Sequence, residues 1–397
     1  MPLRIKAPAN LPELVRTAFN KARASGDVNF YPTQVQLVDV NSVPFQLRFS
    51  PSLANKPKAP QPVGTIDSRI PSPPSTTSTG SPVPPAPTKD EAPKKKLVFD
   101  PFDNPSPAML ITQLPPHHNL VLNKFAIVPE HFILSTSEYK EQTHLLEQSD
   151  LEATRACIKA YEQYARNSGR GAGGDGMNEG PTLYAFFNCG QHSGASQPHR
   201  HIQLLVVDKM REGLETTKEE VGKWEVLAQH LIDDKETGRK LPFRVFAERL
   251  EPGMSGEELH AVYLRLYRQA RDAARQFQSS QSPAPQQIQS QPDQQPNGPD
   301  EIETLGEASI SYNLAMTKDV MVIIPRLAEG SAITEGEEVV GKLALNGTVL
   351  AGTALVKSQK EWDALRKAPK RVGELLGNIG LPNLPDGGER KRSPGRL

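Results

Sequence analysis

The sequence predicts an α+β fold in which helices flank a mainly antiparallel sheet. Strand-like and helix-like segments follow one another without the regular βαβ rhythm that predicts a parallel sheet. The sequence shows no internal repeat with a period of about 20 to 50 residues, which argues against a solenoid or a propeller. Three stretches of biased composition separate the patterned segments, so only part of the 397 residues can build a core.

The first predicted element is a helix over residues 11–24, where apolar side chains recur at helical spacing before Gly26. Two strands follow at 35–40 and 45–49, on either side of a turn. Residues 58–96 are rich in Pro, Ser, Thr and Lys and contain almost no aromatic side chains. Such a segment cannot bury enough apolar surface to offset its ordering entropy, so we predict that it is disordered.

The middle of the chain carries the next group of elements. A strand is predicted at 120–128, a helix at 149–167, a second strand at 182–187 and a third at 199–207. The glycine-rich insert at 168–180 is interpreted as a flexible loop, because no Lys-Ser/Thr follows it as a phosphate-binding Walker loop requires.

The last third alternates strands and helices over residues 241–275 and then becomes Gln/Pro/Ser-rich at 276–300, which we predict to be disordered. Beyond this insert we expect three strands and one helix, at residues 310–314, 320–324, 348–356 and 360–366. The predicted organisation is thus an N-terminal part at 1–220, a C-terminal part at 241–370 and a flexible tail at 371–397.

Composition argues against a nucleic-acid or membrane partner. Lys and Arg total 46, as do Asp and Glu, so no overall field favours nucleic acid or an anionic membrane. No run approaches about 18 apolar residues, and the N-terminus lacks the apolar segment of a signal peptide. Two cysteines, Cys157 and Cys189, are too few for a disulfide framework or a metal cluster. We therefore expect a soluble cytoplasmic protein, with the basic run at 389–394 as a candidate nuclear signal or a solvated tail.

The most informative segment is the motif His-Arg-His-Ile-Gln at residues 199–203, which runs into an apolar stretch. Side chains of a strand alternate between two faces, so His199, His201 and Gln203 share one face with about 6.6 Å between neighbours. Ile202 shares the other face with the apolar residues that follow. Three nitrogen-bearing side chains in a row suit a site in which one imidazole attacks and its neighbours orient the reacting group.

The residues upstream of the motif make the signal more specific. The segment 188–190 leads into Ser-Gly-Ala-Ser-Gln-Pro at 193–198, whose backbone N–H groups and hydroxyls can bind phosphate oxygens. With this segment, the motif resembles the histidine triad superfamily, in the transferase branch where glutamine replaces the third histidine. The likeness is to the fungal ATP adenylyltransferases, also called diadenosine tetraphosphate phosphorylases. Further similar blocks stand at 44–57, 122–132, 311–317 and 324–326.

The resemblance implies a histidine-triad-like sheet and a role for each motif residue. His201 is the expected nucleophile, and a neutral imidazole, with a pKa of about 6.5, attacks phosphorus well near pH 7. His199 helps to hold His201, and Gln203 donates a hydrogen bond to the phosphoryl oxygens. Nucleotide and polyphosphate contacts are implied for Lys56, Asn123, Lys124, Asn188, Ser193, Gly194, Ala195, Ser196, Gln197, Gln203, Ser311, Tyr312, Asn313, Thr317 and Arg326.

The resemblance also implies an activity. The expected reaction is reversible phosphorolysis of diadenosine tetraphosphate to ATP and ADP through a covalent histidine–AMP intermediate, with ADP/sulfate exchange as a side activity. The expected cofactor is a divalent cation, Mg²⁺, bound with the substrate phosphates, because no carboxylate cluster indicates a protein-held metal site. We expect no tightly bound organic cofactor. The expected partners are the nucleotides and phosphate, with the protein a monomer.

Two other functions are compatible with the sequence. Hexose-1-phosphate uridylyltransferases carry His-Pro-His-Pro-Gln, and here Arg200 and Ile202 stand at the two proline positions. From a different class, the chain would be a nucleotide-binding regulatory module without turnover. Turnover of UDP-glucose with galactose-1-phosphate identifies the first, and absence of phosphate-dependent ATP release from the dinucleotide is expected of the second.

Overall fold

The computed structural model describes residues 5–52, 99–167, 182–214, 224–281 and 304–383. The predicted disordered segment at 58–96 and the glycine-rich insert at 168–180 lie outside these ranges. The same is true of residues 282–300 and of the basic run at 389–394. In the part of the chain that is described, no helix is long and apolar enough to cross a membrane.

An eight-stranded sheet forms the centre of the fold, and every pair of neighbours in it is antiparallel. Its order is β10-β12-β11-β8-β9-β7-β5-β4. The strands are β4 (Leu110–Leu114), β5 (His118–Leu122), β7 (Phe132–Thr136), β8 (Leu183–Cys189), β9 (His201–Val206), β10 (Phe246–Arg249), β11 (Tyr312–Met316) and β12 (Val320–Pro325). The predicted α+β class with a mainly antiparallel sheet is confirmed. Both predicted parts of the chain contribute strands to this sheet, while the division between them stays a prediction.

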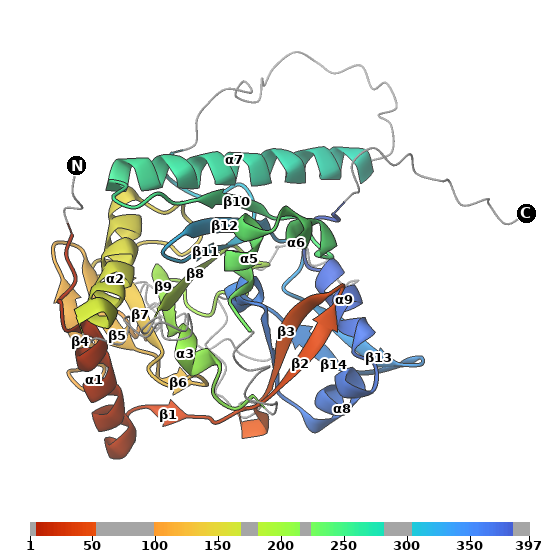
Figure 1. The fold of residues 1–397 in the computed structure, drawn as a ribbon, viewed down its shortest axis with the longest axis horizontal. Helices are drawn as coiled ribbons and strands as arrows, with labels where there is room; N and C mark the ends of the chain where they lie inside the picture. The colour runs from red at the N-terminus through yellow and green to blue at the C-terminus, as the bar shows by residue number, and fades with distance from the viewer. Residues whose placement is uncertain (1–4, 53–98, 168–181, 215–223, 282–303, 384–397) are drawn as a thin grey trace, which may run out of the picture.

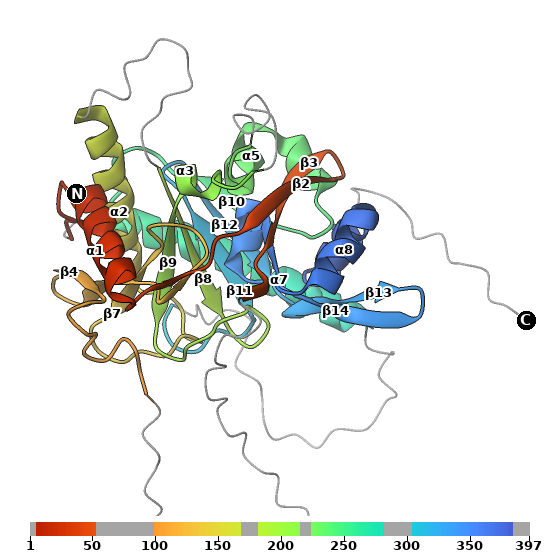
Figure 2. The ribbon, with the colours of Figure 1, turned by 90° about the horizontal axis from the view of Figure 1, so that it is seen from below.

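Two long helices cover one face of this sheet (Figures 1 and 2). They are α2 (Gln148–Asn167) and α7 (Gly256–Gln281), and α1 (Leu11–Ser25) lies beside α2. Apolar side chains of β9, Ile202, Leu204 and Val206, pack in one buried core with both α2 and α7. The other face of β9 is therefore the one that carries His201.

A second layer packs against the opposite face of the sheet, over β8 and β12. Its core joins Phe45 and Trp362 to Tyr184 and Phe186 of β8. A three-stranded sheet of order β15-β3-β2 forms this layer with a β13–β14 hairpin and short helices. These elements are β2 (Gln34–Val40), β3 (Val43–Phe49), β13 (Gly330–Glu335), β14 (Glu338–Ala344), β15 (Thr353–Val356), α3 (Val207–Met210), α5 (Leu227–Asp233), α6 (Lys235–Lys240), η2 (Gly347–Ala351), α8 (Gln359–Lys367) and α9 (Lys370–Gly377). A short parallel pair, β1 (Asn29–Phe30) with β6 (Phe125–Ala126), connects α1 to the main sheet.

Two predicted strands are interrupted. The strand expected at 120–128 ends with β5 at Leu122, because the Asn123 side chain accepts the N–H of Phe125 at 2.9 Å and turns the chain before β6. The strand expected at 348–356 begins instead as the 3₁₀ turn η2, which Asn346 caps by accepting the N–H of Thr348. Gly352, at a φ of +72°, ends that turn before β15.

The predicted boundaries of the last insert and of the tail are wrong. Helix α7 continues to Gln281, so residues 276–281 are helical, and Phe277 packs beside Ala273 and Ala274. The tail expected from 371 begins inside α9, where Val372 and Leu376 are fully buried. In both places apolar side chains at helical spacing outweigh the polar composition around them.

Candidate active site

His201 is the first residue of β9 and lies between two neighbouring strands. It pairs with Ser135 of β7, and the next pairs of β9 run along β8. Gln203, paired with Phe186, lies on the same face two residues further along. His199 precedes the strand and forms a single bridge with Glu141. The predicted alternation therefore holds for His201 and Gln203, and His199 is placed by contacts outside the sheet.

The ring of His201 has a defined tautomer. Its Nδ1 lies 2.8 Å from the carbonyl oxygen of His199. A carbonyl oxygen can only accept, so Nδ1 carries the proton and Nε2 keeps a lone pair. Burial lowers the pKa of His201 to about 4, although its hydrogen bond to the backbone carbonyl oxygen of His199 acts to raise it. The imidazole is thus neutral at neutral pH, as a nucleophile must be. Phe102 covers it, with 5.0 Å between the ring centroids.

His199 is held at both ring nitrogens. Its Nδ1 lies 2.7 Å from Oδ2 of Asp100, and its Nε2 lies 2.9 Å from the hydroxyl and 3.0 Å from the carbonyl oxygen of Thr136. The Tyr139 ring, which is 54% exposed, stands 5.3 Å from the His199 ring. Asp100 and Thr136 were not predicted from the sequence. His199 therefore has a fixed orientation, as its expected supporting role requires.

Gln142 joins the end of β8 to the start of β9 through its side chain. Its Oε1 accepts the N–H of His201 at 2.7 Å, and its Nε2 donates to the carbonyl oxygens of Asn188 (2.7 Å) and His201 (3.2 Å). Gln142 is 2% exposed, so these bonds are shielded from water. Gln142 was not predicted from the sequence, because it lies 59 positions before His201 and in no recognisable motif.

The predicted phosphate loop approaches the same end of the sheet. Ser193 is buried and its hydroxyl donates to the carbonyl oxygen of Gly190 at 2.7 Å, while Ala195 and Ser196 are exposed. Gly194 has a φ of +78°, and a Cβ there would stand 2.7 Å from the carbonyl oxygen of Leu345. The loop therefore packs closely on the 345–346 segment at Gly194, where any side chain would be strained and crowded.

A buried polar network ties the loop to the sheet. Oδ1 of Asn188 accepts from Nδ2 of Asn313 at 2.9 Å and from the N–H of Gly347 at 2.8 Å. Asn313 also donates to the carbonyl oxygen of Ser193 at 2.8 Å and accepts from Arg326. Burial lowers the pKa of Arg326 to about 10, which leaves it charged at neutral pH. Three predicted residues, Asn188, Asn313 and Arg326, are thus brought together behind the loop.

Other predicted residues lie farther from His201. Thr317 follows the last residue of β11, and its hydroxyl donates to Gln229 at 3.3 Å. Tyr312 lies in the core under α7, its hydroxyl 2.6 Å from that of Tyr263. Asn123 and the exposed Lys124 follow the end of β5 that pairs with Phe132, whereas His201 pairs with Ser135.

One more predicted residue is close to the loop. The hydroxyl of Ser311 accepts the N–H of His192 at 3.2 Å. Lys56 lies outside the described residues. The nucleotide contacts expected of the whole predicted set stay predictions.

The sequence matches two protein-family descriptions. Residues 85–177 and 175–221 match the Ap4A phosphorylase N-terminal domain, and residues 239–382 match the ATP adenylyltransferase C-terminal domain. A Saccharomyces cerevisiae protein named diadenosine 5',5'''-P1,P4-tetraphosphate phosphorylase 2 is 30% identical over 296 residues, which cover 72% of this chain and 77% of that protein. Protein APA1 from the same yeast is 24% identical over 391 residues, which cover 95% of this chain and 96% of that protein.

Solved structures show the same fold. The crystal structure of yeast Ap4A phosphorylase Apa2 superposes with a TM-score of 0.61 at 22% identity, covering 94% of this chain and 98% of that one. The same yeast protein in complex with Ap4A gives 0.62 at 21% identity, with the same coverage. At this level of identity the likeness establishes the architecture, and the chemistry has to be argued from the residues.

Proposed function

This chain belongs to the Ap4A phosphorylase family, and on that premise we propose that it transfers an adenylyl group from diadenosine tetraphosphate to inorganic phosphate. The products are ATP, which leaves in the first half of the reaction, and ADP, which forms in the second. The observation that carries the proposal is the neutral, Nδ1-protonated imidazole of His201 at the centre of the site.

The first displacement uses the lone pair on Nε2 of His201. It attacks the α-phosphorus, an N–P bond forms, and the bond to the bridging oxygen breaks with ATP as the leaving group. The ring gains positive charge as the N–P bond forms. The carbonyl oxygen of His199, 2.8 Å from Nδ1, stabilises that charge. In the second displacement a phosphate oxygen attacks the same phosphorus, the N–P bond breaks, and neutral His201 and ADP result.

Gln203 distinguishes this chemistry from hydrolysis. It lies on the same face as His201, and its amide does not titrate near neutral pH. It can therefore donate a hydrogen bond to a phosphoryl oxygen, but it cannot activate water as a general base. A polyphosphate leaving group and a phosphate acceptor need no acid or base, so transfer proceeds where hydrolysis does not.

We propose that Mg²⁺ accompanies the substrate, held by its phosphates. Among the described residues no group of three or more His, Cys, Asp or Glu side chains is placed to hold a metal ion. The carboxylate of Asp100 already binds the His199 ring, with 2.7 Å between Oδ2 and Nδ1. The donors present thus fit an ion bound chiefly by phosphate oxygens, where it would offset negative charge on the leaving group.

A single assay tests the proposed function. Purified protein is incubated with diadenosine tetraphosphate with and without inorganic phosphate, and the nucleotides are separated by chromatography. The proposal predicts sustained formation of ATP and ADP in equal amounts with phosphate, and without phosphate no ADP and at most one ATP per protein molecule. AMP and ATP formed without phosphate would indicate a hydrolase instead. Turnover of UDP-glucose with galactose-1-phosphate would indicate a uridylyltransferase, and binding without any product would indicate a regulatory module.

A further inference from the structure

Arg200, the residue between the two histidines of the motif, faces away from the site and into a buried cluster of charges. We propose that Arg200 is a positioning residue, which orients the nucleophile His201 by fixing the peptide unit between His199 and Arg200. This inference rests on the proposed function and adds to it a group that touches neither substrate nor reacting atoms.

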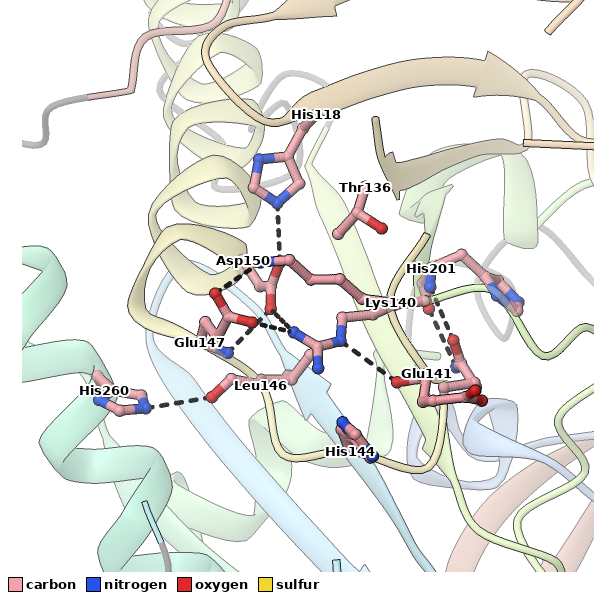
Figure 3. Close-up of polar contacts among 12 residues, drawn as sticks. His118, Thr136, Lys140, Glu141, His144, Leu146, Glu147, Asp150, His201 and His260 are labelled. Atoms are coloured by element: carbon pink, nitrogen blue, oxygen red, sulfur yellow. Dashed lines mark hydrogen bonds and ion pairs between the residues drawn. The ribbon is translucent and has the colours of Figure 1, made fainter. Parts of the chain in front are cut away.

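The guanidinium of Arg200 is anchored at the start of α2. Its Nη1 donates to Oε1 of Glu147 at 2.9 Å and to Oδ2 of Asp150 at 3.0 Å. The other oxygen of Asp150, Oδ1, accepts from Nε2 of His118 at 2.8 Å. Its Oδ2 also accepts the N–H of Glu147 at 2.9 Å. Figure 3 shows Glu147, the residue before α2, beside Asp150 of its first turn, with His118 of β5 directed at Asp150. The side chains of Arg200, Asp150 and His118 are at most 4% exposed.

Backbone and side-chain contacts close a ring around this anchor. The N–H of Arg200 donates to the carbonyl oxygen of Lys140 at 2.7 Å. Nζ of Lys140 pairs with Oε2 of Glu147 at 2.7 Å, and Glu147 pairs in turn with Arg200. The ring therefore returns to the residue from which it began, and it holds both the main chain and the side chain of Arg200.

The ring acts on His201 through one planar group. The N–H of Arg200 and the C=O of His199 belong to the same peptide unit, so fixing one fixes the direction of the other. That C=O is the acceptor for Nδ1 of His201 at 2.8 Å. If the peptide rotated, His201 would lose the acceptor that selects its tautomer, and its Nε2 lone pair would no longer be held toward the substrate.

The carboxylates that contact Arg200 stay ionised at neutral pH. Burial alone would raise the pKa of Asp150, but the hydrogen bond from His118 and the charge of Arg200 hold it below its usual value. Burial acts on Glu147 in the same direction, and hydrogen bonds from Lys140 and Arg200 hold its pKa low as well. Buried ion pairs add little net stability, whereas fixing one geometry is a use for which they are well attested. A positioning role is therefore the better explanation of this cluster.

The main test is Arg200→Met, with Arg200→Lys as the conservative variant. We expect Arg200→Met to lower kcat and the rate of adenylyl transfer to His201 together, by about tenfold or more, with KM within about threefold of wild type. Arg200→Lys keeps a cation that can reach one carboxylate and should recover most of that loss. The matched control is Arg271→Met, which removes a buried arginine of α7 that pairs with Asp272 at 3.0 Å. It should leave kcat unchanged.

If Arg200→Met does not fold, a second variant and a spectroscopic measurement still test the inference. Lys140→Met opens the ring at a side chain that is 28% exposed. In this variant, ¹⁵N NMR of labelled histidines should show His201 shifting from one tautomer to a mixture, together with a lower kcat. Wild-type kcat, or an unchanged tautomer, in a folded ring variant would overturn the inference. An inactive wild-type protein would instead count against the proposed function.

Discussion

Nδ1 of His201 donates to the carbonyl oxygen of His199 at 2.8 Å, so one histidine of the motif sets the protonation of the other through its main chain. The ring of His199 is meanwhile held by Asp100 and Thr136. The two histidines therefore have separate tasks, and each task predicts a different response to mutation or pH.

The first prediction concerns pH. Because the pKa of His201 is lowered to about 4, the ring is neutral and nucleophilic above that value and protonated below it. The profile of kcat/KM, which reports the free enzyme, should show no loss from His201 between about pH 8 and pH 5. Rates should be compared only where circular dichroism shows folded protein. An inflection near pH 6.5 that coincides with the titration of His201, followed by ¹⁵N NMR, would contradict the assigned environment.

Asp100→Asn tests how His199 is supported. The substitution removes the carboxylate that lies 2.7 Å from Nδ1 of His199 and leaves a neutral amide of the same shape. We expect kcat to fall by about 10- to 100-fold, since an orienting carboxylate fixes both the direction and the tautomer of its histidine. Asp103→Asn, at an exposed carboxylate three residues away, is the control and should behave as wild type. Equal rates for the two variants would refute the assigned role.

Gly194→Ala tests the packing of the phosphate loop. Alanine at a φ of +78° is strained, and its Cβ would meet the carbonyl oxygen of Leu345 at 2.7 Å. The expected cost is about 1–3 kcal/mol of unfolding free energy, with a displaced loop and a raised KM. Gly253→Ala has the same kind of strain, at a φ of +89°, and no atom within 4 Å of the added Cβ. It should lose stability without a change in KM, as measured by thermal unfolding and steady-state kinetics.

Gln203→His should redirect the adenylyl intermediate toward water. A new imidazole on the face of His201 supplies a general base, a role worth about 10²-fold or more when well placed. The ratio of AMP to ADP should therefore rise, which chromatography of the products measures directly. Gln113→His adds a histidine at an exposed position of β4 and should leave the ratio unchanged. If Gln203→His also leaves it unchanged, other parts of the site exclude water.

The sequence predicted the face of β9 that carries His201 and Gln203, because a two-residue period is a local property of a strand. It did not predict Asp100 or Gln142, which reach the motif from 99 and 59 positions away in the chain. Their contacts depend on how the strands pair, and no local pattern records that pairing. The alternating pattern also gave no reason to select Arg200. Its ion pair with Asp150 forms only because α2 packs beside the strand.

The structural elements that were not predicted from the sequence were missed for equally specific reasons. The hairpin β13–β14 was missed because most of its side chains are exposed or half-buried, so it lacks the apolar alternation of a strand. Helix α9 was missed because its basic and glycine residues hide the spacing of Val372, Leu375 and Leu376. The split at Asn123 depends on a single side-chain hydrogen bond, which propensity does not predict.

The central claim is that His201 becomes covalently adenylylated, and trapping that intermediate tests it most directly. Protein is exposed briefly to labelled diadenosine tetraphosphate without phosphate, digested and examined by mass spectrometry. The account predicts AMP on His201, labile to acid and stable to base as a phosphoramidate is. His201→Ala should lose the label and about three powers of ten or more in kcat, while His230→Ala keeps both. Label on another residue, or normal turnover by a folded His201→Ala protein, would contradict it.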